Sequence, residues 1–141
     1  MKKFKFSLED ILSFRQFEQQ QAEFELGKAL AAEQQLQAKL DAVASRKADV
    51  QKYSAGSLDF TEIASAYRFC DFSRAKSELL KGMMANAQRV SDEKRELLRC
   101  AMKKTDALKR LKEEQEETYY ADVIREEDNF IDDMVAGRYK R

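Results

Sequence analysis

The sequence predicts an all-α fold: a long antiparallel two-helix coiled-coil hairpin with a longer second helix. Its 141 residues include no proline and only four glycines, the residue types that most strongly interrupt helices. The main cluster of turn-forming residues surrounds Gly56, and the chain on both sides is rich in strong helix formers. We therefore expect a single coiled-coil domain over residues 1–141, with helix 1 at about 7–54, a turn at about 54–59 and helix 2 at about 60–136.

The first helix is marked by a capping residue and a periodic apolar stripe. Ser7 is a favourable N-cap, and the acidic residues Glu9 and Asp10 follow it in the first turn. Apolar residues then recur with the alternating spacing of four and three that a coiled-coil seam requires. The expected seam residues are Leu8, Leu12, Ala22, Leu26, Ala29, Leu36, Leu40, Val43 and Val50, with Arg15, Gln19, Glu33 and Lys47 as polar interruptions.

The second helix begins after Asp59, a predicted N-cap, with Glu62 at the third helical position. Gly137 is the expected residue just after its end. The apolar pattern predicts a seam through Phe69, Phe72, Leu79, Met83, Val90, Leu97, Cys100, Ala107 and Leu111.

The two predicted helices differ in length, so the second must extend past the first. Folding the chain about Gly56 places Leu12 near Ala101 and leaves helix 2 unpaired from about Leu108. This overhang carries apolar side chains within an acidic stretch. One interpretation is a solvated, fraying helix; the interpretation we favour is a helix that docks on a partner. Its candidate binding residues are Leu111, Tyr119, Val123 and Ile124.

Two other groups of apolar residues are candidate surfaces. Aromatic residues cluster near the turn, where exposed rings often anchor a partner; the candidates are Tyr53, Tyr67, Phe69 and Phe72. A second face on helix 1 consists of Phe14, Phe17 and Phe24, which lie away from the expected seam. Either the N-terminal arm and nearby Lys and Arg stems cover this face, or it contacts a partner or a second copy.

Composition argues against several classes of function. Basic and acidic residues number 26 each, which disfavours nucleic-acid binding because that requires clustered positive charge. The chain lacks His, the commonest general base. Cys70 and Cys100 are too far apart on one helix for a disulfide and suit a reducing cytoplasm. With no phosphate loop, metal-ligand set or membrane-length apolar run, we expect no enzyme, no cofactor and no membrane insertion.

The opening residues carry a family resemblance. Phe4, Phe6, Leu8, Ile11 and Leu12 fit the pattern F-x-F-x-L-x-x-[ILV]-L-x-x-R, which Arg15 completes. The pattern resembles the start of the flagellar export protein FliJ family. The chain is also similar to that family in its length, its single break and its longer second helix, although these features are shared by stalk proteins of virulence-type III secretion.

The resemblance implies a non-catalytic stalk similar to the central subunit of rotary ATPases. Such a protein is expected at the centre of the hexameric export ATPase, linking it to the membrane export gate and binding export chaperones. The resemblance therefore implies a cytoplasmic protein peripherally associated with the inner-membrane export apparatus. The end with both termini would enter the ring, and the turn would face the gate. The alternatives are a structural, self-associating coiled coil and a general secretion chaperone.

Overall fold

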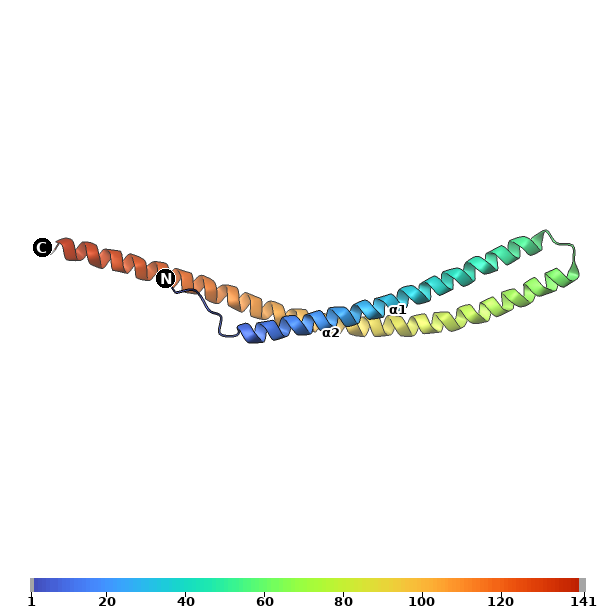
Figure 1. Cartoon of the computed structure of the whole chain (residues 1–141), viewed down its shortest axis with the longest axis horizontal. Coiled ribbons are helices and arrows are strands. Elements are labelled where there is room, and N and C mark those ends of the chain that lie inside the picture. The colour runs from blue at the N-terminus through green and yellow to red at the C-terminus, as the bar shows by residue number, and fades with distance from the viewer. Residues whose placement is uncertain (1, 140–141) are drawn as a thin grey trace. The chain divides into compact units, whose positions relative to one another are not determined.

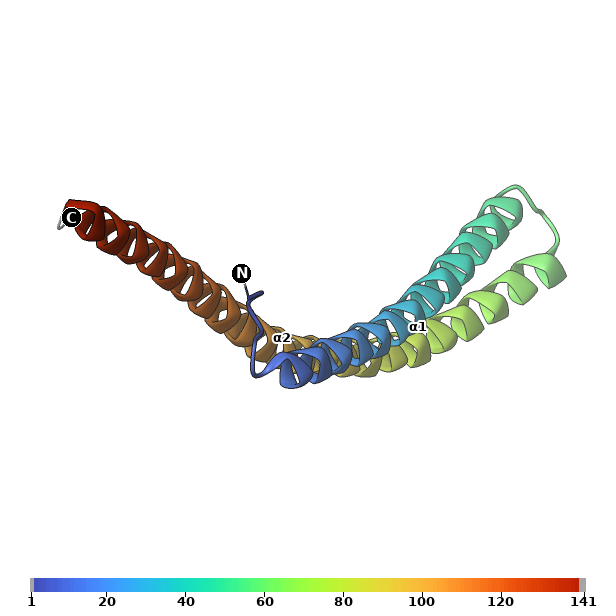
Figure 2. The ribbon, with the colours of Figure 1, turned by 60° about the vertical axis from the view of Figure 1, so that its left-hand side comes forward.

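A computed structural model describes residues 2–139. The chain forms helix α1 (Glu9–Ala55) and helix α2 (Phe60–Tyr139), with no strand in the described part. The turn between them reverses the chain, so that α1 and α2 run in opposite directions on leaving it (Figures 1 and 2). The predicted all-α hairpin with a longer second helix is confirmed.

The helix ends follow from local hydrogen bonds. The Leu12 N–H donates to the Leu8 carbonyl at 2.8 Å, so α1 begins at Glu9 and Leu8 occupies the N-cap position predicted for Ser7. Asp59 caps α2 as predicted: its Oδ1 accepts the Thr61 N–H at 3.0 Å.

The far end of α2 differs from its prediction. Gly137 lies inside the helix, and no described glycine has positive φ. It therefore does not form the left-handed C-terminal cap that was expected.

The chain divides into two compact units, and both helices contribute to each. The first unit contains the residues up to Gln21 and those from Arg99 onward; the second contains Ala22–Leu98.

In the second unit, the predicted seam of α1 is confirmed. Ala29 and Val43 are buried, and the other seam positions of α1 in this unit are partly buried, including the polar residues Glu33 and Lys47. The strict four–three alternation therefore continues through the polar interruptions.

The predicted seam of α2 is wrong by one residue along most of its length. Phe72 and Leu79 are exposed, whereas the next residues, Ser73 and Leu80, are buried. Ser91 is fully buried after the partly buried Val90. Small side chains such as Ser73 and Ser91 share this seam with larger ones such as Leu80. The prediction missed it because it followed the most apolar residues. In α2 the seam positions are Ser73, Ser77, Leu80, Met84, Ala87, Ser91, Lys94 and Leu98 in this unit, and Ala101, Thr105, Leu108 and Lys112 in the other.

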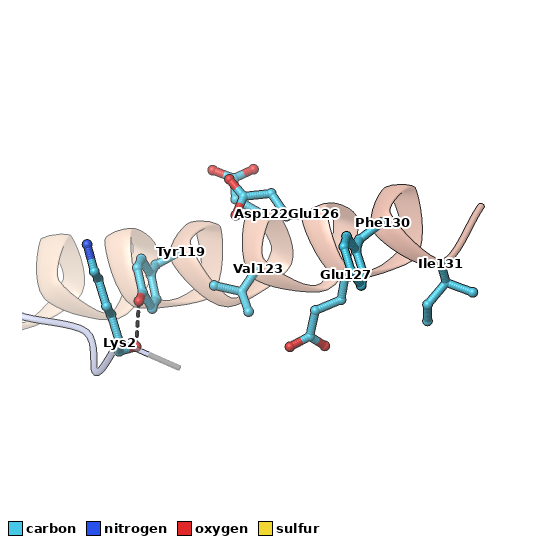
Figure 3. A pocket seen from close by; sticks show the side chains of 8 residues that line it. All are labelled: Lys2, Tyr119, Asp122, Val123, Glu126, Glu127, Phe130 and Ile131. Carbon is cyan, nitrogen blue, oxygen red and sulfur yellow. Dashed lines mark hydrogen bonds between the residues drawn. The ribbon is translucent and has the colours of Figure 1, made fainter. Parts of the chain in front are cut away.

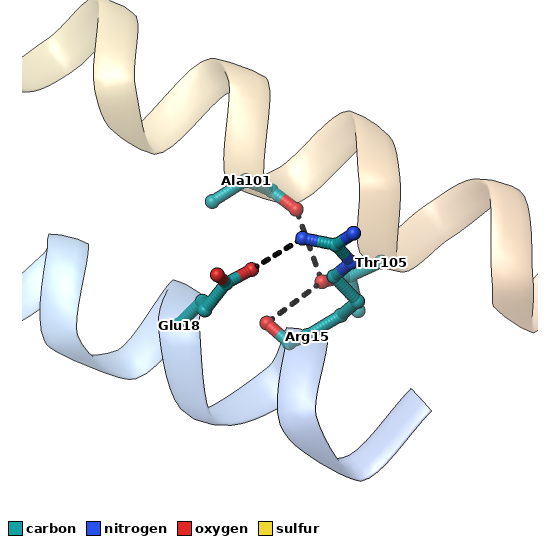
Figure 4. A network of polar contacts seen from close by, with 4 residues as sticks. All are labelled: Arg15, Glu18, Ala101 and Thr105. Atoms are coloured by element: carbon teal, nitrogen blue, oxygen red, sulfur yellow. Dashed lines mark hydrogen bonds and ion pairs between the residues drawn. The ribbon is translucent and has the colours of Figure 1, made fainter. Parts of the chain in front are cut away.

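In the first unit, Thr105 fixes the pairing of the helices. Its hydroxyl lies 3.2 Å from the Arg15 carbonyl across the seam and 3.0 Å from the Ala101 carbonyl in its own helix (Figure 4). The Arg15 guanidinium forms an ion pair with Glu18 at 2.8 Å. The expected register places residue 98 opposite Arg15, so the observed register is shifted by about one heptad. The fully buried Thr105 fits between the helices at this level.

Candidate functional site

The unpaired end of α2 begins later than the sequence suggested. Lys112 Nζ forms an ion pair with Glu9 Oε2 at 3.0 Å, at the first residue of α1. The non-helical arm before α1 then continues along α2 (Figure 1). The expected overhang from Leu108 is therefore covered past Lys112, as far as Tyr119.

The arm is held on α2 by aromatic and polar contacts. Phe6 is buried, and the Phe4 ring lies 5.6 Å from the Tyr119 ring. The Tyr119 hydroxyl donates to the Lys2 carbonyl at 2.5 Å, as Figure 3 shows. Tyr119 thus holds the described part of the arm against α2.

A few residues beyond Tyr119, the described part of α2 becomes fully exposed. Every described residue from 124 to 139 is exposed. We call residues 120–139 the distal end of α2. Continuing the seam spacing past Tyr119 gives four polar residues in succession: Asp122, Glu126, Asn129 and Asp133. The pairing seam therefore stops in the sequence as well as in the structure.

The distal end nevertheless has an apolar face, which is displaced from the seam line. Its residues recur at helical spacings of three and four and form a wide stripe interrupted by Glu127. In Figure 3, Val123 and Ile131 lie on the side of the helix opposite Asp122 and Glu126. The exposed members of this stripe are Tyr120, Ile124, Phe130, Ile131, Met134 and Val135.

The four residues predicted for this end are placed differently from one another. Leu111 and Val123 are partly buried, Tyr119 is occupied by the arm, and Ile124 is 59% exposed. The larger exposed surface lies further along, at residues 130–135, which the predicted set omitted. Their repeated i, i+4 spacing is the signal that would have extended it.

The turn end of the hairpin carries a shallow groove between α1 and α2. Tyr53 and Phe69, two of the predicted residues, line it together with Val50 and Ala66. The other two predicted residues, Tyr67 and Phe72, are exposed and do not line it.

The turn itself contributes two apolar side chains absent from the predicted set. Leu58 is fully exposed and Phe60 is 83% exposed. Leu58 lies in the turn and Phe60 directly follows it. A large apolar residue at such a position is the sequence signal that indicates an exposed apolar side chain.

The three phenylalanines of the second face are all more than half exposed. Phe14 and Phe17 belong to the first unit and Phe24 to the second. The Arg15 guanidinium lies 5.9 Å from the Phe14 ring centroid, and Lys28 Nζ lies 4.6 Å from that of Phe24. Cationic side chains thus cover parts of this face, whereas the arm makes its aromatic contact with Tyr119 instead.

The described residues offer no other kind of site. No group of three or more His, Cys, Asp or Glu side chains there is arranged to hold a metal ion. Neither helix, over its described length, has an apolar run able to cross a membrane. The surfaces that stand out are the distal end of α2, the groove at the turn and the exposed apolar stripes.

Comparison with known proteins relates the chain to a family. Residues 4–141 match the family model described as Flagellar FliJ protein. No curated protein and no solved structure matches the chain.

Proposed function

Because the chain belongs to the FliJ family and is a component of the flagellar export apparatus, we propose that it is a stalk that binds the export ATPase through the distal end of α2. In this proposal the protein works by binding and carries out no reaction. The turn end contacts the membrane export gate, so the stalk links the two. The protein is then cytoplasmic and held at the inner membrane through the export apparatus.

The observation that supports this proposal best is the exposed apolar face on an unpaired helix. Water exposure disfavours large apolar side chains, and Ile124, Phe130 and Ile131 are each more than half exposed. A helix with such a stripe suits recognition in a groove or ring lined by apolar residues.

Charge supports a basic partner surface. Residues 120–139 contain six acidic and two basic side chains, a net charge of −4. The acidic run at residues 113–117 precedes them, and Glu113, Glu114 and Glu117 are exposed. Opposite charge on the ATPase would speed encounter, and the apolar stripe would lengthen the lifetime of the complex.

We assign the two other surfaces to the remaining partners. The gate is proposed to contact the turn end, where Tyr53 and Phe69 line a groove and Tyr67 and Phe72 lie exposed nearby in sequence. Export chaperones are proposed to use Phe14 and Phe17 or, separately, Phe24. Exposed aromatic rings are frequent anchors in protein interfaces.

The test is binding to the purified hexameric export ATPase. The double variant Ile124→Asp and Ile131→Asp should weaken binding by roughly a hundredfold, since each apolar anchor contributes more than about 1 kcal/mol. It should also abolish ATPase stimulation. Both positions are exposed, so helix content should not change.

Leu58→Asp is the matched control, because Leu58 is fully exposed but lies at the turn. It should leave ATPase affinity unchanged. Full affinity in the double variant, or equal loss in the control, would remove the distal end of α2 from the proposed site.

A further inference from the structure

Within the second unit, α2 carries an exposed stripe that the hairpin does not use. Its residues lie one position before the seam residues and repeat with the same alternation of three and four. Phe72, Leu79, Met83 and Leu97 are between 48% and 67% exposed. Val90 is partly buried, and the remaining positions of the stripe are the exposed polar residues Lys76, Asn86 and Glu93.

We propose that this stripe is a self-association face, on which α2 of a second copy packs in the antiparallel direction. The two-fold axis passes between residues 84 and 85. Each residue then meets the one equally distant on the other side of this midpoint. The resulting layers pair Phe72 with Leu97, Lys76 with Glu93, Leu79 with Val90, and Met83 with Asn86 of the second copy.

Charge complementarity selects this arrangement. A stripe with heptad spacing can pack against a second helix in the parallel or the antiparallel direction, so spacing alone does not determine the arrangement. In the antiparallel dimer Lys76 meets Glu93, and symmetry forms this pair twice. In a parallel, in-register pair, Lys76 would meet Lys76 and Glu93 would meet Glu93. A second copy packed in the antiparallel direction therefore pairs opposite charges and also buries the apolar residues of the stripe.

Within a single chain, the charged residues of the stripe make only weak interactions that would compete with the dimer. Glu93 pairs with Arg89 at 3.3 Å, but both side chains are more than 60% exposed, and such pairs contribute little stability. Gly82 lies beside the stripe, and a Cβ built there would meet nothing within 4 Å. That open space leaves room for a second helix. The dimer rests on residues 72–97 alone and is independent of the proposed ATPase site.

The experiment is the mass of the full chain in solution, measured by light scattering and sedimentation equilibrium at pH 7 and low salt. Reductant is needed because Cys70 and Cys100 are free thiols. At concentrations on the order of 100 µM, well above a micromolar Kd, the expected mass is about 33 kDa, twice the 16.4 kDa of one chain. Leu79→Glu should give a monomer with unchanged helix content, because Leu79 is exposed.

Charge reversal with rescue distinguishes this register from other dimers. Lys76→Glu and Glu93→Lys should each weaken the dimer roughly tenfold, since each dimer contains the pair twice. The double variant, with both reversals, should restore the wild-type Kd. Lys81→Glu is the control, because Lys81 is exposed on the opposite side of α2. A monomer at all concentrations overturns the proposal and leaves the stripe to another protein. A dimer that Lys76→Glu does not weaken, or that the double variant does not restore, also overturns it.

Discussion

Removing either of the two most deeply buried hydroxyls in the helix seam should change the free energy of unfolding, but in opposite directions. Ser91 and Thr105 are both fully buried. The Thr105 hydroxyl has carbonyl acceptors at 3.0 and 3.2 Å, whereas Ser91 Oγ has no hydrogen-bond partner among the described residues. We therefore compare Thr105→Val with Ser91→Ala.

The expected sizes follow from what each hydroxyl gains in the folded state. Thr105 has one hydroxyl proton, so it donates to only one carbonyl at a time. Losing that bond should reduce the free energy of unfolding by about 1 kcal/mol. Burying the unpaired Ser91 hydroxyl costs about 1–3 kcal/mol. Removing the hydroxyl relieves this cost but also loses the packing of its oxygen atom, so the free energy of unfolding should rise by about 1 kcal/mol.

Urea unfolding followed by circular dichroism measures both changes, with thermal melting as a second readout. Each variant should shift Tm by roughly 3 °C, downward for Thr105→Val and upward for Ser91→Ala. Measurements belong at low protein concentration, so that self-association does not contribute. If Ser91→Ala destabilises the chain as much as Thr105→Val does, the Ser91 hydroxyl must be satisfied and the argument from the seam is wrong.

Three further predictions use stability as the readout. Leu80→Ala should cost about 2–3 kcal/mol because Leu80 is buried, whereas Leu58→Ala should change stability by less than about 0.5 kcal/mol because Leu58 is fully exposed; equal effects would contradict the seam. Gly27→Ala should stabilise by up to about 1 kcal/mol, since an added Cβ meets nothing within 4 Å, and a loss of stability would refute this. Truncation after Tyr120 should leave the unfolding midpoint unchanged, whereas truncation after Leu108 should lower it by removing the Glu9–Lys112 and Phe4–Tyr119 contacts; equal midpoints would contradict the arm's role.

The sequence could identify the hairpin and one side of its seam. The absence of proline and the turn around Gly56 predict two helices, and Asp59 marks the start of the second. In α1 the apolar residues and the buried positions coincide, as at Leu12 and Val43. For this helix, periodicity is sufficient.

The seam of α2 was not predictable from hydrophobicity, because that helix has two stripes and the more apolar one is exposed. Leu79 is more apolar than Ser73 or Ser91, yet Leu79 is exposed and the two serines are buried. The strict alternating spacing from Ser73 to Lys112 gives the observed seam, but only if serine, threonine and lysine are accepted as seam residues.

The candidate site shows the same limit. The sequence indicates an unpaired, apolar end of α2, and Ile124 is exposed there as the docking hypothesis requires. It does not show that the arm reaches Tyr119, because that contact depends on a register shifted by about one heptad. Local sequence patterns predict which face of a helix is apolar. They do not predict which distant segment packs against that face, so the contact between the arm and Tyr119 required the structure.

Binding of the distal end of α2 to the export ATPase can be tested by site-specific photo-crosslinking in motile cells, with a photoreactive residue replacing Ile131. Ile131 is 56% exposed on the distal end of α2. If the distal end of α2 binds the export ATPase, an adduct with the ATPase forms at this position, and none forms when the same residue replaces Leu58 at the turn. An ATPase adduct from position 58 but none from position 131 would contradict it.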